Sequence, residues 1–133
     1  MTETSNEQST PIYTAIGGEA VVRQIVRRFY ELMDTLPEAK ACRAVHPPSL
    51  AGSELKLFEY LSGWLGGPQL YVAKYGHPML RRRHFVASIG PEEISGWLLC
   101  FETALAENVQ QPALRDAILR PVRQLAIHMH NKA

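Results

Sequence analysis

The sequence predicts an all-α domain, and three observations support this. Apolar residues recur at the three- and four-residue spacing of a helix in four long segments. Glycine and proline residues punctuate the chain between such segments, most clearly at Gly66-Gly67-Pro68. Few stretches alternate between apolar and polar residues, so no strand is expected. The expected picture is four substantial helices, some short ones and a long irregular crossing in the middle.

The first long helix is expected at Glu19–Asp34, where seven apolar residues fall on one face. Gly17-Gly18 precedes this segment, and Pro37 stops the helix or starts a short following turn. Residues 42–50 contain Pro47-Pro48, so a loop or bend is expected there.

Ser53 is expected to cap the second long helix, which the two glycines and the proline at 66–68 end sharply. Residues 69–78 are mixed in pattern. A short helix is expected from His77-Pro78 to about Phe85, with proline at its first position. The apolar face of the second helix consists of Leu57, Phe58, Leu61, Trp64 and Leu65.

Gly90-Pro91-Glu92-Glu93 is typical of a helix start, because acidic residues in the first turn favour the helix dipole. The last helix is expected over Pro112–Asn131, and Pro121 inside it should kink it or mark a break. The apolar face of the third helix consists of Ile94, Trp97, Leu98, Phe101 and Leu105.

The composition indicates one domain of an ordinary soluble protein. The chain has 133 residues and is 46% hydrophobic, which suits one core at residues 11–133 behind a disordered polar tail at residues 1–10. A net charge of +1 argues against a nucleic-acid or anionic-membrane partner. No apolar run approaches the ~20 residues that span a bilayer, and no signal peptide is evident. We therefore expect a cytoplasmic protein whose two cysteines are reduced.

The motifs of common enzymes and metal sites are absent from the sequence, including GxSxG, GxGxxG, the P-loop, HExxH and CxxC. Among the five histidines, His128 and His130 suit the surface, His77 suits a turn, and His46 lies in a bend from which it could reach the interior. His84 follows three arginines and precedes Phe85-Val86. By pattern alone a structural role for His84 is favoured over metal binding.

Several other residues also have an ordinary structural interpretation. The three arginines before His84 suit a solvated face, and Cys42 and Cys100 suit buried small apolar positions. The aromatic residues Phe29, Tyr30, Trp64 and Trp97 would by default belong to the core.

An ordered set of short motifs resembles the group II truncated haemoglobins, over nearly the whole chain from Ile12 to about Asn131. Each motif is weak by itself, but their order is specific. In chain order they are Gly17-Gly18, Phe29-Tyr30, the segment Gly-Trp-Leu-Gly-Gly-Pro at 63–68, Tyr71, Gly76-His77-Pro78, Arg81-Arg82-Arg83-His84 and Trp97-Leu98.

The resemblance implies a truncated globin, a two-over-two helical sandwich around haem b, with His84 as the proximal ligand of the iron. The basic residues nearby then acquire a function, because the two haem propionates are anionic. Lys56 and Arg81 are the preferred propionate partners, ahead of Tyr71 and Tyr75.

On the opposite, distal side of the haem, Tyr30 and Trp97 match the polar pocket residues of the family, and His46 matches a third, variable position. Hydrogen-bond donors in a dry pocket stabilise the partial negative charge of bound dioxygen and slow its release. Ser53 takes the place of the distal histidine of larger globins and would ease ligand entry. Phe29, Leu57 and Tyr60 would line the haem together with Ser53.

Three functions remain open on the sequence. The first is a haem protein that binds dioxygen, carbon monoxide, nitric oxide or similar ligands, used for redox or reactive-species detoxification rather than oxygen storage. The second is a dedicated haem enzyme, a peroxidase or nitric oxide dioxygenase, with an external reductase as electron donor and His46 as the acid–base group. The third is a helical interaction module without a cofactor, which leaves the predicted convergence of Tyr30, His46, His84 and Trp97 unexplained.

Overall fold

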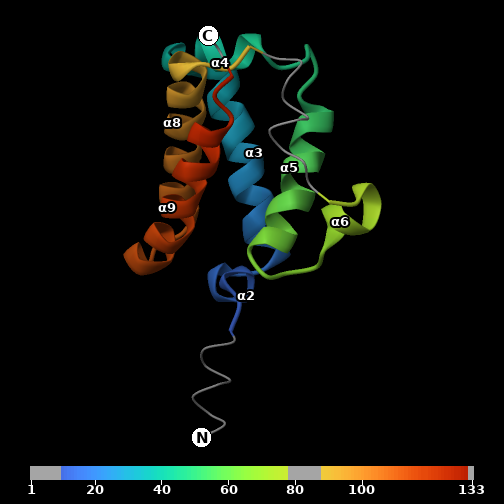
Figure 1. Cartoon of the computed structure of the whole chain (residues 1–133). Helices are drawn as coiled ribbons and strands as arrows, with labels where there is room; N and C mark the ends of the chain where they lie inside the picture. The colour runs from blue at the N-terminus through green and yellow to red at the C-terminus, as the bar shows by residue number, and fades with distance from the viewer. Residues whose placement is uncertain (1–9, 78–87, 132–133) are drawn as a thin grey trace, which may run out of the picture.

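A computed structural model of the chain describes residues 10–77 and 88–131, and every regular element in these ranges is helical. The all-α prediction is therefore confirmed, and so are the four substantial helices, α3, α5, α8 and α9 (Figure 1). The expected polar tail at 1–10 lies outside the described residues apart from Thr10. The expected short helix from His77 to about Phe85 lies outside them from residue 78 onward, so Arg81 and His84 are not described. The elements are α2 (Ile12–Ile16), α3 (Glu19–Thr35), η1 (Pro37–Ala39), α4 (Lys40–Ala44), α5 (Ala51–Trp64), α6 (Leu70–Tyr75), α8 (Pro91–Asn108) and α9 (Pro112–His128).

Helix α3 is the centre of the fold, because it packs against both α5 and α8. Helix α6 lies against α5 on one side, and α9 lies against α8 on the other (Figure 1). The face of α3 predicted from its spacing is buried, and burying it provides much of the hydrophobic stabilisation of the domain. The buried residues of α3 are Val22, Ile25, Val26, Phe29, Tyr30, Leu32 and Met33.

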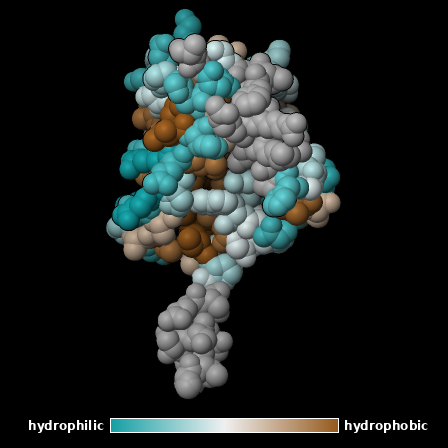
Figure 2. All heavy atoms as spheres, in the orientation of Figure 1, coloured by the Kyte–Doolittle hydropathy of each residue, from teal (hydrophilic) through white to brown (hydrophobic). Residues whose placement is uncertain are grey.

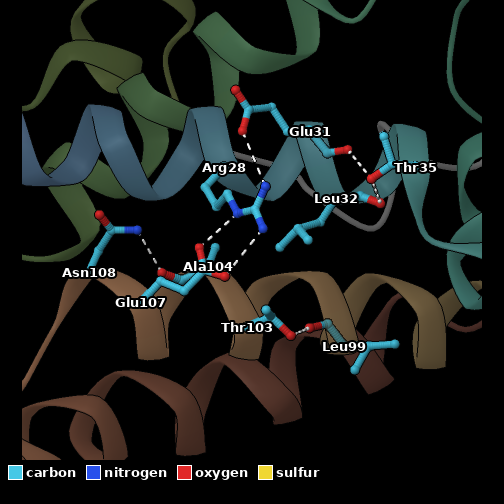
Figure 3. Close-up of polar contacts among 9 residues, drawn as sticks. All are labelled: Arg28, Glu31, Leu32, Thr35, Leu99, Thr103, Ala104, Glu107 and Asn108. Atoms are coloured by element: carbon cyan, nitrogen blue, oxygen red, sulfur yellow. Dashed lines mark hydrogen bonds and ion pairs between the residues drawn. The ribbon is translucent and has the colours of Figure 1, made fainter.

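An ion pair joins the solvent-facing sides of α3 and α8. The Arg28 guanidinium donates to Glu107 through Nε at 2.7 Å and through Nη2 at 3.3 Å, and it also lies 3.4 Å from Glu31 (Figure 3). Because Arg28 and Glu107 are exposed, this pair contributes little to stability. The contact joins two helices that carry site residues, Tyr30 on α3 and Trp97 on α8.

Two segments are helical where the sequence analysis expected a loop or saw only a mixed pattern. The predicted loop at 42–50 was wrong at its start, because α4 continues to Ala44 and the bend begins only at Val45. Arg43 holds this bend by donating to the carbonyl oxygens of Pro47 at 2.9 Å and Pro48 at 2.8 Å. The mixed segment 69–78 contains α6. A helix of six residues is too short to be stable in isolation, so α6 depends on contacts with the rest of the fold.

The predicted cap of α5 was also wrong. Helix α5 begins at Ala51, and the Glu54 amide already donates to the Leu50 carbonyl oxygen at 2.8 Å, so Ser53 lies inside the first turn. The serine that serves the helix start is Ser49, whose Oγ accepts from the Ala51 amide at 3.3 Å. The predicted end at Gly66 is confirmed, with a positive φ of 94° that suits glycine.

The start of α8 is confirmed, because Glu93 Oε1 accepts a hydrogen bond of 2.7 Å from the Gly90 amide. Pro121 does not break α9, which is continuous from Pro112 to His128. The proline side chain is exposed, so water can satisfy the carbonyl that loses its partner. The helix ends before the predicted Asn131, because Asn131 forms hydrogen bonds of 2.7 and 2.8 Å with the Ile89 backbone.

Within the described ranges, no helix combines the length and apolar character needed to cross a bilayer.

Candidate functional site

A cluster of aromatic rings centred on Phe29 joins α3 to α8. The Phe29 ring lies 4.8 Å from Tyr30 and 4.9 Å from Trp97 between centroids, both in edge-to-face contact. The Trp97 ring stacks on Phe101 at 5.3 Å. Edge-to-face and stacked pairs fix ring orientation as well as burying area, so this cluster holds Tyr30 and Trp97 in defined positions.

The Tyr30 side chain is only 7% exposed, and its hydroxyl donates to the Ser53 carbonyl oxygen on α5 at 3.3 Å. Such a length is greater than the usual 2.7–2.8 Å of a hydroxyl donor, so the bond is weak. Burial raises the pKa of Tyr30 above its ordinary value, and nearby Cys42 and Glu54 add to this effect. The hydroxyl therefore stays protonated and remains a donor at neutral pH.

His46 follows α4 and approaches Tyr30, with 6.1 Å between the ring centroids. Its Nδ1 lies 2.9 Å from the Cys42 carbonyl oxygen. Because a carbonyl oxygen only accepts, Nδ1 must carry the proton, and the neutral ring has its acceptor at Nε2. The backbone of α4 thus sets both the tautomer and the orientation of His46.

Trp97 is half-buried on α8, although the Phe101 ring beneath it is buried. Its indole N–H makes no hydrogen bond within the part of the chain that the structure describes. A half-buried donor with an apolar ring behind it suits a ligand that needs one hydrogen bond in a dry setting.

A second aromatic cluster, which we call the tyrosine edge, consists of Tyr60, Tyr71 and Tyr75. The Tyr71 ring lies 5.9 Å from Tyr60 and 4.8 Å from Tyr75. The Lys56 ammonium lies 5.7 Å from the Tyr75 ring centroid, within the range of a cation–π contact. The structure thus brings the predicted residues Lys56, Tyr60, Tyr71 and Tyr75 together across α5 and α6.

Sequence reasoning missed two members of this region, Glu59 and Lys74. Lys74 Nζ donates to Glu59 Oε2 at 3.0 Å, and the same ammonium lies 5.4 Å from the Tyr75 ring centroid. A signal was present, because Glu59 is a charged residue within the apolar segment Leu57–Ser62. A charged residue in such a position is buried only with a partner.

The remaining candidates have ordinary structural surroundings. His128 and His130 are exposed, as expected, and His77, expected in a turn, is exposed in a bend. Cys42 and Cys100 are free and buried, and burial raises the pKa of Cys42 to about 12 and that of Cys100 to about 11. Both thiols therefore stay protonated at neutral pH and are poor nucleophiles.

With this geometry established, comparison with known proteins identifies the family. The model of the family described as "Bacterial-like globin" matches residues 11–131. The chain belongs to this globin family. Members of the family bind haem b, so the predicted cofactor is confirmed, and this globin binds small diatomic ligands such as oxygen through haem.

Three relatives place this globin more closely. It is 34% identical to the group 2 truncated haemoglobin YjbI of Bacillus subtilis. The match extends over 120 residues, which are 90% of this chain and 88% of the relative. The group II 2-on-2 haemoglobin of Agrobacterium tumefaciens is 59% identical, with a TM-score of 0.92 over 94% of this chain and 97% of that one. The cold-adapted truncated haemoglobin of Pseudoalteromonas haloplanktis TAC125 is 42% identical, with a TM-score of 0.90 over 93% and 100%.

These relatives confirm the resemblance to group II truncated haemoglobins and the two-over-two globin fold. They also exclude the interaction module without a cofactor as the leading interpretation of this globin.

The residues described in this globin fit a haem group. Haem has a broad apolar body with two carboxylates, and it needs half-buried apolar side chains with cations and hydroxyls at one edge. Leu57, Tyr60, Trp97 and Leu98 are half-buried and pack on the core, while Lys56 and the tyrosine edge supply polar groups. Figure 2 shows that apolar residues also reach the surface near the middle of the face in view, beside polar residues.

Proposed function

We propose that this globin binds dioxygen tightly and uses it in redox chemistry or the detoxification of reactive species, rather than in oxygen storage. The observation that carries the proposal is the Tyr30 hydroxyl, a buried donor whose hydrogen bond to the Ser53 carbonyl oxygen, at 3.3 Å, is weak. Such a donor gives up little free energy when it leaves the Ser53 carbonyl oxygen and donates to a bound dioxygen instead. Tight binding means slow release, which suits a carrier or store poorly.

The gas-binding side of the proposal rests on three side chains from separate elements. Tyr30 from α3 and Trp97 from α8 donate hydrogen bonds to the bound ligand, and the Phe29 ring between them holds both in place. His46, held by the Cys42 carbonyl oxygen, has its ring 6.1 Å from that of Tyr30 and is the third polar group. In a dry pocket these donors stabilise negative charge more strongly than water does.

The haem supplies an iron at which the diatomic ligand is bound, and His84 is the proposed proximal ligand of that iron. His84 and Arg81 lie outside the described residues, so their assignment comes from the sequence motif. Lys56, Arg81, Tyr71 and Tyr75 are the proposed partners of the propionates. The proposed lining of the haem consists of Phe29, Ser53, Leu57 and Tyr60.

A second candidate function is a dedicated haem enzyme, acting on peroxide or nitric oxide with an external reductase as electron donor. The observation that favours it is the placement of His46, a residue type suited to proton transfer, whose Nδ1 is held by the Cys42 carbonyl oxygen and whose ring lies 6.1 Å from that of the buried Tyr30. Unchanged reactivity towards hydrogen peroxide in a His46→Leu variant would remove this acid–base role.

The first experiment is an absorption spectrum of the purified protein, ferric and then ferrous with carbon monoxide. A strong Soret band that shifts with carbon monoxide is expected in the wild type, and it should weaken or change in His84→Ala. His128→Ala, at an exposed position, is the matched control and should keep the wild-type spectrum. A wild-type spectrum in His84→Ala would overturn the assignment of the iron ligand.

The second measurement is the rate of oxygen release from the ferrous protein. Tight binding predicts slow release in the wild type. Release as fast as that of an oxygen store would contradict the proposed redox or detoxification function, while leaving haem binding itself intact.

A further inference from the structure

Glu59 is the most unusual charged residue in the described ranges. Its side chain is 10% exposed, and one carboxylate oxygen, Oε2, accepts from Lys74 Nζ at 3.0 Å. The other oxygen, Oε1, is buried and has no hydrogen-bond partner among the residues that the structure describes. A half-satisfied buried carboxylate is costly, so stabilisation of the fold is a poor explanation for this pair.

The Glu59–Lys74 pair and the Tyr60–Tyr71 ring contact come from adjacent residues of α5, and both reach α6. Glu59 holds Lys74, and the next residue on α5, Tyr60, holds the Tyr71 ring at 5.9 Å. Helix α6 has only six residues, which is too short for it to keep its shape without such contacts. Its position on α5 is therefore set by these two contacts, by the approach of the Lys56 ammonium to the Tyr75 ring at 5.7 Å, and by its apolar packing.

Lys74 also connects Glu59 to the tyrosine edge. Its ammonium lies 5.4 Å from the Tyr75 ring centroid, and the Lys56 ammonium lies 5.7 Å from the same ring. The hydrogen bond to Glu59 is the largest cause of the raised pKa of Lys74, which keeps the ammonium charged. A displacement of Lys74 would therefore move Tyr75 and, through the ring contact of 4.8 Å, Tyr71.

We propose that Glu59 is a positioning residue, which fixes α6 on α5 through Lys74 and so holds Tyr71 and Tyr75 where the haem carboxylates are bound. This inference rests on the propionate assignment made under the proposed function. Glu59 itself does not contact the haem in this proposal. Its effect passes through Lys74 to the two tyrosines.

The test uses the holoprotein and measures the rate at which haem transfers to an excess of a haem-scavenging apoglobin. The variant Glu59→Met with Lys74→Met replaces the ion pair by apolar side chains, so the fold should remain stable. Haem loss should nevertheless be about tenfold faster, in line with the loss of a hydrogen bond between charged groups. The matched control is Glu102→Gln, which breaks the 2.9 Å ion pair between α8 and Arg123 of α9, and haem loss should not change.

Two further measurements separate positioning from a general loss of structure. Hydrogen exchange of the α6 amides in the holoprotein should accelerate in the double variant, while exchange in α8 stays unchanged. Urea unfolding should show a stability close to that of the wild type. If haem loss and α6 exchange both match the wild type, Glu59 does not position α6 and the inference is wrong.

The propionate assignment is tested separately by Lys56→Met and Tyr75→Phe, which leave the Glu59–Lys74 pair intact. If these variants accelerate haem loss and the double variant does not, only the inference about Glu59 fails. If these variants leave haem loss unchanged, the propionate assignment fails. Accelerated α6 exchange in the double variant would still support the attachment of α6 by Glu59.

Discussion

The Tyr30 hydroxyl on α3 donates a hydrogen bond of 3.3 Å to the carbonyl oxygen of Ser53 in the first turn of α5. Tyr30 also belongs to the buried aromatic cluster, through its ring contact with Phe29. Because the bond is long, it keeps the hydroxyl oriented without holding it strongly. This relationship joins the two helices and keeps a donor ready for a bound ligand.

Tyr30→Phe should release dioxygen faster than the wild type by about 10- to 100-fold, since a hydrogen bond to a partly charged acceptor is worth about 1.5–3 kcal/mol. Stopped-flow measurement of oxygen release from the ferrous protein checks this. The control Tyr13→Phe removes a hydroxyl from α2 and should leave the rate unchanged. An unchanged rate in Tyr30→Phe would show that this hydroxyl does not contact the ligand.

Trp97→Phe should also accelerate oxygen release, by about tenfold, because it removes one hydrogen-bond donor. The smaller ring can still stack on Phe101 and meet the edge of Phe29, so the stability measured by urea unfolding should change little. Both quantities should be measured on the same preparation. A large loss of stability with unchanged oxygen release would mean that Trp97 serves packing alone.

The long helices could be predicted from the sequence because each has a face that must be buried, and burial imposes a helical period. The buried face of α3 and the glutamate that reaches back to the Gly90 amide both follow from local pattern. The short helices α4 and α6 could not be predicted in this way. They depend on distant contacts, such as those of Arg43 with Asp34 and of Tyr71 with Tyr60.

The candidate site was likewise predicted only in part from the sequence. Tyr30 and Trp97 were found through a family resemblance, since periodicity alone assigns both to the core. Their contact with a shared neighbour, Phe29, required the three-dimensional arrangement. The Glu59–Lys74 pair was missed because a side chain's partner 15 residues away cannot be read from local spacing.

The free energy of unfolding should fall as the pH rises above about 9. Burial holds the pKa of Cys42 at about 12 and that of Cys100 at about 11, against an ordinary value of 9.0. The unfolded chain therefore loses these protons at lower pH than the folded chain does, which favours unfolding. Urea unfolding between pH 7 and pH 10.5 checks this, and Cys42→Ala should show a shallower fall. Equal slopes in the two proteins would contradict the assignment to Cys42.

Gly96→Ala should destabilise the fold by about 1–3 kcal/mol, because a Cβ there meets backbone atoms that have little room to move. It would lie 3.0 Å from both the Ala39 Cα and the Glu38 carbonyl oxygen, where α8 crosses η1. Gly52→Ala is the matched control, since nothing lies within 4 Å of its Cβ, and it should stabilise α5 by about 0.5–1 kcal/mol. Urea unfolding of both variants measures the difference. Equal effects would mean that α8 can shift away from η1 at no cost.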